Sequence, residues 1–333
     1  MTEVLLLMPT SHRRSILTTQ AAARLAETGT VREAPTATDH ADPRIRELLM
    51  TAEIIVTGTG TARLDEEDLR AAPCAKAIIH AAGTLRPIVG EYAYDLGLVL
   101  SSLAPVNAIP VAEYTLAMIL LELKGVNAIA ATYQRARQTL DVDALLAGHG
   151  VYHRTVGIVG ASRIGRLVIE LLSNFDVEIL LSDPSIDQSA ARQLGAHLVD
   201  LPTLVNSADV ISLHAPLLPE TRHMIDAPLL AMIRDGAVLI NTARGGLMDH
   251  EALLTELRTG RFRAVLDVTD PEPPPTTSPF WDLDNVLLTP HVAGSRGLEL
   301  QRIGEEVAAE VERFVRGEPL RYAVTRHRYA ASA

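Results

Sequence analysis

The sequence predicts an α/β protein built from two mostly parallel sheets. Short apolar runs, typical of buried strands, alternate along the chain with polar stretches that suit helices, which favours strand–helix–strand units. Two such series follow one another, and a long apolar helical stretch separates them. With 333 residues, the chain is long for one domain and sufficient for two.

The first series contains four predicted strands, at residues 4–8, 53–57, 76–81 and 98–102. The long helix that follows is expected to begin at Pro110, because proline is favoured in the first turn of a helix. Its apolar residues nearly surround it, so we expect it to be buried on more than one side. Such a helix suits a domain junction or a subunit interface.

The second series contains six predicted strands, at residues 156–159, 178–182, 210–214, 237–241, 264–268 and 285–288. The helix between the fourth and fifth of these strands should begin after an N-cap at Asp249 and end near Gly260. A last amphipathic helix is expected at residues 297–315. The tail after Gly317 is predicted to be a partly ordered terminus.

Composition and charge exclude several classes of partner. The net charge of −11 and pI near 5.5 argue against nucleic acid or an anionic membrane, since both require clustered lysine and arginine. Cys74 is the only cysteine, which excludes an intrachain disulfide and argues against a cysteine metal site, so no metal is expected. No apolar stretch is expected to reach the length of a transmembrane helix, and the first residues suit a strand better than a signal peptide, which predicts a cytoplasmic protein.

A glycine-containing turn at residues 160–165 (G-A-S-R-I-G) predicts a dinucleotide site. It follows a strand and opens a helix, which is the context this motif requires. Gly160 makes the tight turn, Gly165 allows close packing of helix on strand, and the helix N-terminus offers N–H groups to a pyrophosphate. Ser162 occupies the position of the usual middle glycine, and its hydroxyl is able to donate to phosphate. The alternative is a strand–helix turn without a ligand.

Asp183 ends the next predicted strand, eighteen residues after Gly165. An acid at this position accepts hydrogen bonds from ribose hydroxyls and repels a 2′-phosphate. No arginine follows it to hold that phosphate, so the sequence favours NAD over NADP.

Three ionisable residues follow predicted strands near the end of the second series, namely Arg244, Glu272 and His291. Ligands bind at the carboxyl ends of the strands in such sheets. A guanidinium can hold a carboxylate through two hydrogen bonds, and histidine is a suitable proton carrier. Glu272 would fix the histidine tautomer and stabilise the imidazolium. Each residue taken alone also fits a structural role; together they predict hydride transfer with a carboxylated substrate.

With these residues in place, the chain resembles the NAD-dependent D-isomer-specific 2-hydroxyacid dehydrogenase family over nearly its whole length. The segments that carry the resemblance are V-A-E-Y-T-L-A-M-I-L (111–120), G-I-V-G-A-S-R-I-G (157–165), S-L-H-A-P-L-L-P-E-T-R (212–222), D-G-A-V-L-I-N-T-A-R-G-G-L-M-D (235–249), L-D-V (266–268) and N-V-L-L-T-P-H (285–291).

The resemblance implies a doubly wound Rossmann NAD-binding domain at residues 107–294. This domain would be inserted into a flavodoxin-like substrate-binding domain at residues 1–106 and 295–333. Arg244, Glu272 and His291 match the family's catalytic arginine, acid and histidine. The residues implied to contact NAD, with Asp267 at the nicotinamide amide, are Gly160, Ser162, Arg163, Ile164, Gly165, Asp183, His214, Ala215, Pro216, Thr221, Thr242, Ala243, Asp267 and Ala293. The resemblance also implies a homodimer.

The substrate loop departs from the family pattern. Members often have G-x-G-x-D-N-I-D after the fourth strand, whereas this chain has H-A-A-G-T-L-R-P-I-V at residues 80–89. The candidate substrate residues are Ala82, Gly83, Thr84, Arg86 and Asn107. Arg86 would add a second positive charge and favour a dianionic substrate; the alternative is that it points to solvent or pairs structurally.

The expected function is therefore the NAD-dependent interconversion of a small 2-keto acid and its D-2-hydroxy acid. Two alternatives stay open. In the first, the same scaffold serves another small anion, such as phosphite or a phosphonate; Glu272 argues against formate, for which the family usually carries glutamine. The other alternative is a non-catalytic protein that binds and senses NAD(H).

Overall fold

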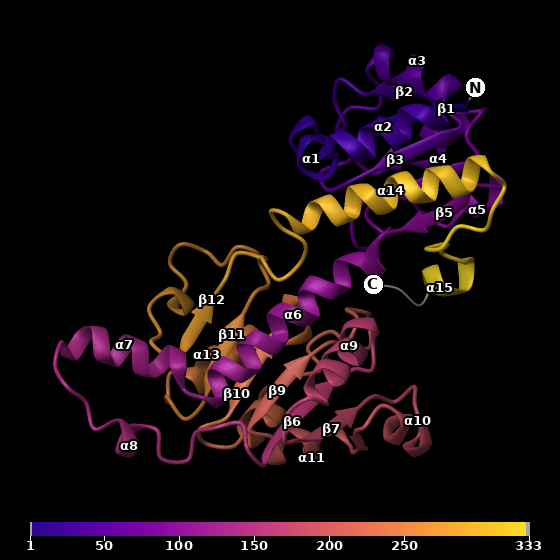
Figure 1. Cartoon of the computed structure of the whole chain (residues 1–333). Helices are drawn as coiled ribbons and strands as arrows, with labels where there is room; N and C mark the ends of the chain where they lie inside the picture. The colour runs from indigo at the N-terminus through magenta and orange to yellow at the C-terminus, as the bar shows by residue number, and fades with distance from the viewer. Residues whose placement is uncertain (1, 331–333) are drawn as a thin grey trace. The chain divides into compact units, whose positions relative to one another are not determined.

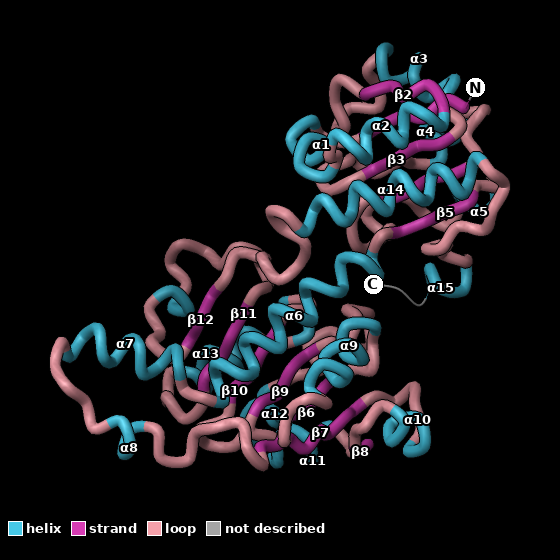
Figure 2. The backbone as a smooth tube through the Cα atoms, in the orientation of Figure 1, coloured by secondary structure: helices cyan, strands magenta, loops and turns pink. Residues whose placement is uncertain are grey.

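The computed structural model describes residues 2–330, which form two α/β units (Figures 1 and 2). The terminal unit comprises residues 1–108 and 295–333, and the central unit comprises residues 109–294. The first boundary lies two residues beyond the one expected from the sequence, and the second coincides with it. Both units contain one parallel sheet with helices on its two faces, so the predicted fold class is confirmed.

The sheet of the terminal unit has the strand order β2-β1-β3-β4-β5, with every pair of neighbours parallel. This order is that of flavodoxin-like folds. The strands are β1 (Thr2–Leu7), β2 (Gly29–Glu33), β3 (Ile54–Thr57), β4 (Ala77–His80) and β5 (Val99–Ser102). β2 lies at the edge and was not predicted, whereas the other four coincide with predicted runs.

Alternate residues of these strands enter two separate hydrophobic cores, as the twofold side-chain period of a strand requires. Leu5 and Leu7 belong to one core, whereas Val4 and Leu6 belong to the other. The first core is covered by α3 (Pro43–Thr51), α4 (Glu66–Arg70), α5 (Tyr92–Asp95) and α15 (Arg326–Ala330). The second is covered by α1 (Thr10–Ile16), α2 (Thr19–Thr28) and α14 (Glu299–Val315).

The C-terminal segment is firmly attached to the terminal unit. The fully buried Glu310 of α14 accepts hydrogen bonds from the Ser101 hydroxyl (2.6 Å) and from the backbone N–H of Arg321 (2.8 Å). The N–H of Val324 donates to the carbonyl oxygen of Leu100 at 2.8 Å. The expectation of a partly ordered tail is therefore wrong for residues 318–330, because polar and backbone contacts with β5 hold them in place.

The sheet of the central unit has the order β12-β11-β10-β9-β6-β7-β8 and is also parallel throughout. Numbered within the unit, this is the Rossmann order 3-2-1-4-5-6 with a seventh strand at one edge. The strands are β6 (Arg154–Val159), β7 (Val177–Ser182), β8 (His197–Leu198), β9 (Val210–Leu213), β10 (Val238–Asn241), β11 (Arg263–Leu266) and β12 (Val286–Leu288). The two-residue edge strand β8 was not predicted.

Helices cover both faces of this sheet and bury a core on each side. Together with the connections they are α6 (Ala104–Leu123), α7 (Val126–Ala136), α8 (Val142–Leu145), α9 (Arg163–Leu172), α10 (Gln188–Gln193), α11 (Leu201–Ser207), α12 (Ala227–Met232), η1 (Gly245–Leu247), α13 (His250–Leu257) and η2 (Pro279–Trp281). Asp249 is the N-cap of α13 and accepts from the N–H groups of Glu251 and Ala252, as the sequence predicts.

The long helix α6 begins at Ala104, six residues before the predicted start, so Pro110 lies inside it. Proline has no N–H to donate to the carbonyl of residue 106, which interrupts the helical ladder beside the boundary between the units. By length and composition alone α6 could cross a membrane, so the expectation that no stretch is long enough was wrong. Half of that apolar window is buried inside the protein, with Ile119 and Leu123 in the core of the central unit.

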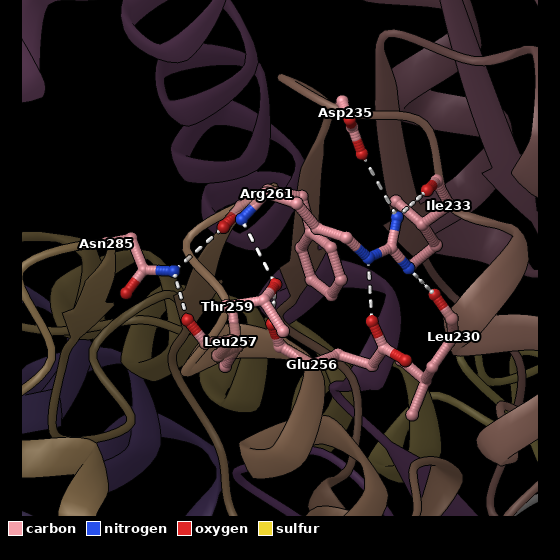
Figure 3. A network of polar contacts seen from close by, with 9 residues as sticks. Leu230, Ile233, Asp235, Glu256, Leu257, Thr259, Arg261 and Asn285 are labelled. Carbon is pink, nitrogen blue, oxygen red and sulfur yellow. Dashed lines mark hydrogen bonds and ion pairs between the residues drawn. The ribbon is translucent and has the colours of Figure 1, made fainter.

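A polar network built around Arg261 lies just before the amino end of β11 (Figure 3). Its guanidinium donates to the carbonyl oxygens of Leu230 in α12 and Ile233 at the end of α12, and it forms an ion pair with Glu256 of α13 at 2.6 Å. Asn285 donates to the carbonyl oxygens of Leu257 and Phe262 at 2.9 and 2.8 Å. The network satisfies helix C-terminal carbonyls next to the amino ends of the strands, away from the ends where β10, β11 and β12 deliver the candidate residues.

Candidate active site

The cofactor turn connects β6 to α9 and depends on two glycines. Gly160 has φ +100°, and a Cβ there would lie 2.7 Å from the backbone nitrogen of Ala215. A Cβ at Gly165 would lie 2.1 Å from the carbonyl oxygen of Gly160. Neither position tolerates a larger residue without a shift of backbone. The turn therefore has the tight geometry that a dinucleotide requires, as the sequence predicts.

Ser162, which replaces the middle glycine, is the N-cap of α9. Its backbone is extended (φ −62°, ψ 176°), so no glycine is required for conformational reasons. The Ser162 hydroxyl oxygen accepts from the N–H of Gly165 at 3.3 Å, which leaves the hydroxyl proton for donation. Arg163 and Ile164 occupy the first positions of the helix, whose N-terminus favours an anion.

Asp183 follows β7 and lies beside the cofactor turn. Its Oδ2 accepts from the N–H of Ala161 at 2.6 Å, and its Oδ1 accepts from the N–H and hydroxyl of Ser185 at 2.7 and 2.6 Å. These bonds hold the carboxylate at the end of the strand, close to the turn. The position is the one from which an acid accepts ribose hydroxyls and repels a 2′-phosphate.

His214 follows β9 and contacts the same turn. Its Cβ lies within 3.3 Å of an ideal Cβ at Gly165. The side chain is 3% exposed; Nε2 lies 2.9 Å from the Ser212 hydroxyl, and Nδ1 is buried without a hydrogen-bond partner. Burial lowers the pKa of His214 to about 3, so the ring is neutral at physiological pH. A buried unpaired nitrogen here is consistent with a site that a ligand completes.

Four further residues assigned to the cofactor, Ala215, Thr221, Thr242 and Ala243, lie on the loops after β9 and β10. Ala215 packs against Gly160, and the Thr221 hydroxyl donates to the carbonyl oxygen of Pro216. The Thr242 hydroxyl lies 3.0 Å from that of Thr115 in α6. Ala243 donates its N–H to the side chain of Asn241 at 3.0 Å. These bonds fix the conformation of both loops.

Arg244 directly follows this segment and opens η1. Its Nη1 donates to the carbonyl oxygen of Ala243 at 2.7 Å. Desolvation by neighbouring atoms lowers the pKa of Arg244, and the nearby charge of Glu272 opposes this shift. Because an arginine pKa starts far above neutral, the group remains a cation available to an anionic ligand.

His291 and Glu272 are in direct contact. The Nδ1 of His291 lies 2.8 Å from the Oε1 of Glu272. The two side chains are 46% and 41% exposed, so solvent screens the pair and its contribution to stability is about 1 kcal/mol or less. This is smaller than the unscreened Coulomb energy of about 4 kcal/mol at ~4 Å and an effective dielectric of ~20. Its main effect is to orient the imidazole.

The backbone of His291 is in the left-handed region, with φ +53°. Such a conformation is uncommon for residues other than glycine and is found preferentially at functional sites. It persists because Asp267 holds the surrounding segment. The Asp267 carboxylate, 1% exposed, accepts from the Thr289 hydroxyl (2.6 Å) and from the N–H groups of Val292 (2.8 Å) and Ala293 (2.9 Å). Its carbonyl oxygen accepts from the N–H of His291 at 3.0 Å.

Two further residues of this network were not singled out from the sequence. The Tyr114 hydroxyl of α6 lies 2.9 Å from the Thr289 hydroxyl, which links α6 to the histidine segment. Burial raises the pKa of Tyr114, so its hydroxyl remains protonated. Thr289 lies between β12 and His291 in the motif L-L-T-P-H. Its position next to the histidine was the feature of the sequence that could have identified it.

The candidate substrate residues lie in the terminal unit, at the carboxyl end of its sheet. Asn107 and Gly83 are close together, since the Asn107 Nδ2 lies 4.0 Å from an ideal Cβ at Gly83. The Asn107 Oδ1 accepts from the N–H of Ser295 at 2.9 Å, and the Ser102 hydroxyl donates to the carbonyl oxygen of Gly83. Ala82 and Thr84 flank this glycine and are partly exposed.

Arg86 extends toward the C-terminal helix. Its Nη2 donates to the carbonyl oxygen of Ala330 at 2.7 Å, and its guanidinium lies 5.8 Å from the centre of the Tyr329 ring. Of the two alternatives that the sequence leaves open, these contacts favour structural pairing over a role at the substrate. Among residues 2–330, no group of three or more His, Cys, Asp or Glu side chains is arranged to hold a metal ion.

Comparison with known proteins agrees with this geometry. The family model described as "D-isomer specific 2-hydroxyacid dehydrogenase, NAD binding domain" matches residues 116–293. The D-3-phosphoglycerate dehydrogenase of Methanocaldococcus jannaschii is 32% identical over 290 residues, which is 86% of this chain and 54% of that protein. The glyoxylate reductase of Korarchaeum cryptofilum is 39% identical over 175 residues, or 52% of this chain and 53% of that protein.

Solved structures are similar over almost the whole chain. A phosphoglycerate oxidoreductase from Rhizobium etli superposes with TM-score 0.82 at 22% identity, covering 98% of both chains, which shows the fold. D-lactate dehydrogenase of Aquifex aeolicus, solved with NAD and lactic acid, gives TM-score 0.74 at 26% identity and covers 95% of this chain and 96% of that one.

The chain spans about half the length of the curated relatives that it matches first, 54% in the Methanocaldococcus protein. The family model nevertheless covers more than half of this chain and ends two residues after His291. The glycine turn, Asp183 and the Arg244–Glu272–His291 group all lie inside the matched region. The chain therefore belongs to the D-isomer-specific 2-hydroxyacid dehydrogenase family, and its central unit is the NAD-binding domain of that family.

Proposed function

We propose that this protein is an NAD-dependent oxidoreductase that interconverts a small 2-keto acid and its D-2-hydroxy acid. The observation that carries the proposal is the 2.8 Å contact between His291 Nδ1 and Glu272, beside the cationic Arg244. Reduction of a keto acid requires a proton donor and a cation that binds the carboxylate. A histidine with a fixed tautomer and a nearby guanidinium provide these two groups. The relatives named as phosphoglycerate dehydrogenase, glyoxylate reductase and lactate dehydrogenase act on acids of this type.

The cofactor turn fits NAD on its own geometry. Gly160 and Gly165 leave space that a side chain would fill, and α9 presents its N-terminus. Asp183 would accept the ribose hydroxyls, and Ser162 would donate to the pyrophosphate. Bound NADH supplies the hydride for the keto carbon, and bound NAD accepts it in the reverse direction.

Each member of the catalytic group has a distinct task in this proposal. Arg244 would bind the substrate carboxylate through paired N–H groups and stabilise the negative charge that develops on the carbonyl oxygen. His291, with Nδ1 held by Glu272, would give the proton of Nε2 to that oxygen during reduction and take it back during oxidation. Glu272 stabilises the imidazolium and prevents the ring from turning.

In the terminal unit, the backbone at Ala82, Gly83 and Thr84 and the side chain of Asn107 are proposed substrate contacts. The Asn107 Oδ1 is already bonded to Ser295, so the amide Nδ2 is the group available to a substrate oxygen. Replacing Asn107 with alanine should raise KM more than it lowers kcat. The change should also be larger for acids with a second polar group.

The direct test is to follow NADH consumption with a panel of 2-keto acids. NAD reduction is measured in parallel with 2-hydroxy acids, phosphite and phosphonates. Wild-type protein should turn over at least one keto acid, and His291→Ala should lose about 10²–10⁴-fold in kcat. His197→Ala, an exposed histidine in the edge strand β8, is a control that should leave kcat largely unchanged. Retention of near-normal kcat in His291→Ala would refute the assigned mechanism.

The panel also separates the alternatives. Turnover confined to phosphite or a phosphonate would keep the scaffold and cofactor but replace the substrate class. Tight NADH binding without turnover of any compound would favour a non-catalytic NAD(H) sensor. The cytoplasmic location expected from the sequence stays a prediction.

We also propose that the protein forms a homodimer through α6, α7 and the segment that contains α8. No residue of α7 or α8 is buried within the chain. Large apolar side chains are exposed there, with Tyr133 at 60%, Val142 at 48%, Leu145 at 46% and Tyr152 at 71%. Apolar groups concentrated on one segment are typical of an interface. Light scattering should give a dimer mass for wild type and a monomer for Tyr133→Asp/Leu145→Asp.

A further inference from the structure

A hollow in the terminal unit is lined by no residue of the cofactor turn or of the Arg244–Glu272–His291 group. It has a volume of about 410 Å³ and is lined by Arg63, Arg86, Gly90, Glu91 and Tyr329. The lining comes from the loop after β3, the loop between β4 and α5, and the C-terminal helix α15. We propose that this hollow binds a small anion that carries a carboxylate or phosphate group.

The two arginines give the hollow its charge. Arg63 Nη1 donates to the carbonyl oxygen of Arg86 at 2.8 Å, and Arg86 Nη2 donates to that of Ala330 at 2.7 Å. Neither guanidinium forms an ion pair with an acid among residues 2–330. Each is therefore fixed by one neutral acceptor and keeps further N–H groups for a ligand. Arginine holds carboxylate and phosphate through paired, charge-assisted hydrogen bonds of this kind.

Several other arginines of the terminal unit do pair with acids. Arg24 pairs with Glu312 at 2.7 Å, and Arg70 pairs with Glu66 at 2.6 Å. The chain has 41 acidic residues against 30 lysines and arginines, so acids were available for pairing. Two neighbouring cations repel each other, and an anion placed against both would remove the repulsion.

The buried part of the wall also lacks an acceptor. The Nε of Arg86 is buried without a hydrogen-bond partner, which is unfavourable unless a ligand supplies an acceptor. Tyr329 is 5% exposed, and its hydroxyl donates to the carbonyl oxygen of Val89 at 2.6 Å, so its ring is a fixed wall below Arg86. Gly90 has no side chain, and a Cβ there would lie only 2.9 Å from Nη2 of Arg63. Any larger residue at this position would therefore displace the guanidinium.

Glu91 is the only acid in the lining, and it makes no hydrogen bond or ion pair with either arginine in the described part of the chain. It is exposed and lies just before α5 without capping it. Its charge opposes an anion without contributing to the packing of the wall. A substitution at this position therefore changes the charge of the hollow with little effect on folding.

The test uses the full chain saturated with NAD, because the cofactor turn would otherwise bind phosphate itself. Calorimetric titrations are made at low ionic strength with inorganic phosphate and, separately, with malonate. Wild type should bind at least one of these anions. The double variant Arg63→Gln/Arg86→Gln should bind it with a Kd that is higher by about tenfold or more. The matched control Arg14→Gln/Arg302→Gln removes two exposed arginines of the same unit and should bind as wild type does. Preference for phosphate or malonate then identifies the class of ligand.

Glu91→Gln should change the affinity for the anion in the opposite direction, and an unfolded variant could not give that result. It should tighten binding about threefold or more at low ionic strength, since it removes the one negative charge from the lining. Bound anion should raise Tm in wild type and more so in Glu91→Gln. Equal affinity of wild type and Arg63→Gln/Arg86→Gln, or no gain in Glu91→Gln, would overturn the proposal. Both arginines would then serve only to hold α15 against the loop after β4.

Discussion

Replacing Asp267 with asparagine separates two tasks of the same residue. The family resemblance implies that Asp267 contacts the nicotinamide amide, whereas the structure shows its carboxylate holding the segment that carries His291. Oδ1 accepts from Thr289 and Val292, and Oδ2 accepts from Ala293, at 2.6–2.9 Å. An asparagine can keep the first two bonds only by turning its NH₂ group toward the third N–H.

The size of the effect follows from this geometry. One buried N–H loses its acceptor and faces a second donor, and the two remaining bonds lose their ionic character. Together these changes cost about 2–3 kcal/mol. For a domain of about 150–250 residues, this corresponds to a fall in Tm of roughly 4–12 °C. The segment of His291 should relax from φ +53°, and a displacement of about 1 Å is worth about 10²-fold in rate.

Steady-state kinetics with the substrate found in the panel, together with NADH affinity by fluorescence, distinguish the two tasks. If Asp267 mainly positions His291, Asp267→Asn should lower kcat by about 10–100-fold with only a small change in NADH affinity. Thr289→Val removes one of these hydrogen bonds and leaves the carboxylate in place. It should also lower kcat, but by a smaller factor than Asp267→Asn. A kcat within about twofold of wild type for Asp267→Asn would refute the positioning role.

Three further predictions rest on single contacts. Glu272→Gln keeps the contact with His291 but removes the negative charge of the carboxylate, so kcat for reduction should fall about 10-fold or more in steady-state assays. Gly160→Ala places a Cβ 2.7 Å from a backbone nitrogen at φ +100°, so NADH affinity should fall at least about tenfold, measured by fluorescence titration. Burial lowers the pKa of His80 to about 4 and of His214 to about 3; unfolding therefore takes up protons, and Tm should fall as pH decreases from about 6.5 through 4, with a shallower fall in His80→Asn.

The sequence predicts the apolar strands, including the edge strands β5 and β12, and misses the more polar edge strands β2 and β8, for a physical reason. Central strands of a parallel sheet are covered on both faces and therefore appear as apolar runs, as β3 and β10 do. β2 and β8 each have a single neighbour and are partly exposed, so their residues need not be apolar. The start of α6 was missed because Pro110, a favourable first-turn residue, is also tolerated inside a helix at a junction.

The candidate site could be predicted because of the order of its strands. β10, β11 and β12 are adjacent and parallel, so the segments after Asn241, Leu266 and Leu288 emerge at one edge of the sheet. Adjacency alone brings the arginine, the acid and the histidine together. It does not determine which acid contacts the imidazole, since Asp267 and Glu272 both follow β11.

Hydrogen-bond satisfaction decides between the two acids. Asp267 is buried, and a buried carboxylate requires several donors, which the backbone and hydroxyl groups of residues 289–293 supply. Glu272 lies farther along an exposed loop and is free to meet Nδ1 of His291. The Asp267 carboxylate thus holds the backbone in place, whereas the Glu272 carboxylate is placed to stabilise charge on the imidazole. The same division explains why His291 can adopt a strained φ of +53°: the bonds to Asp267 hold the segment while its side chain stays accessible.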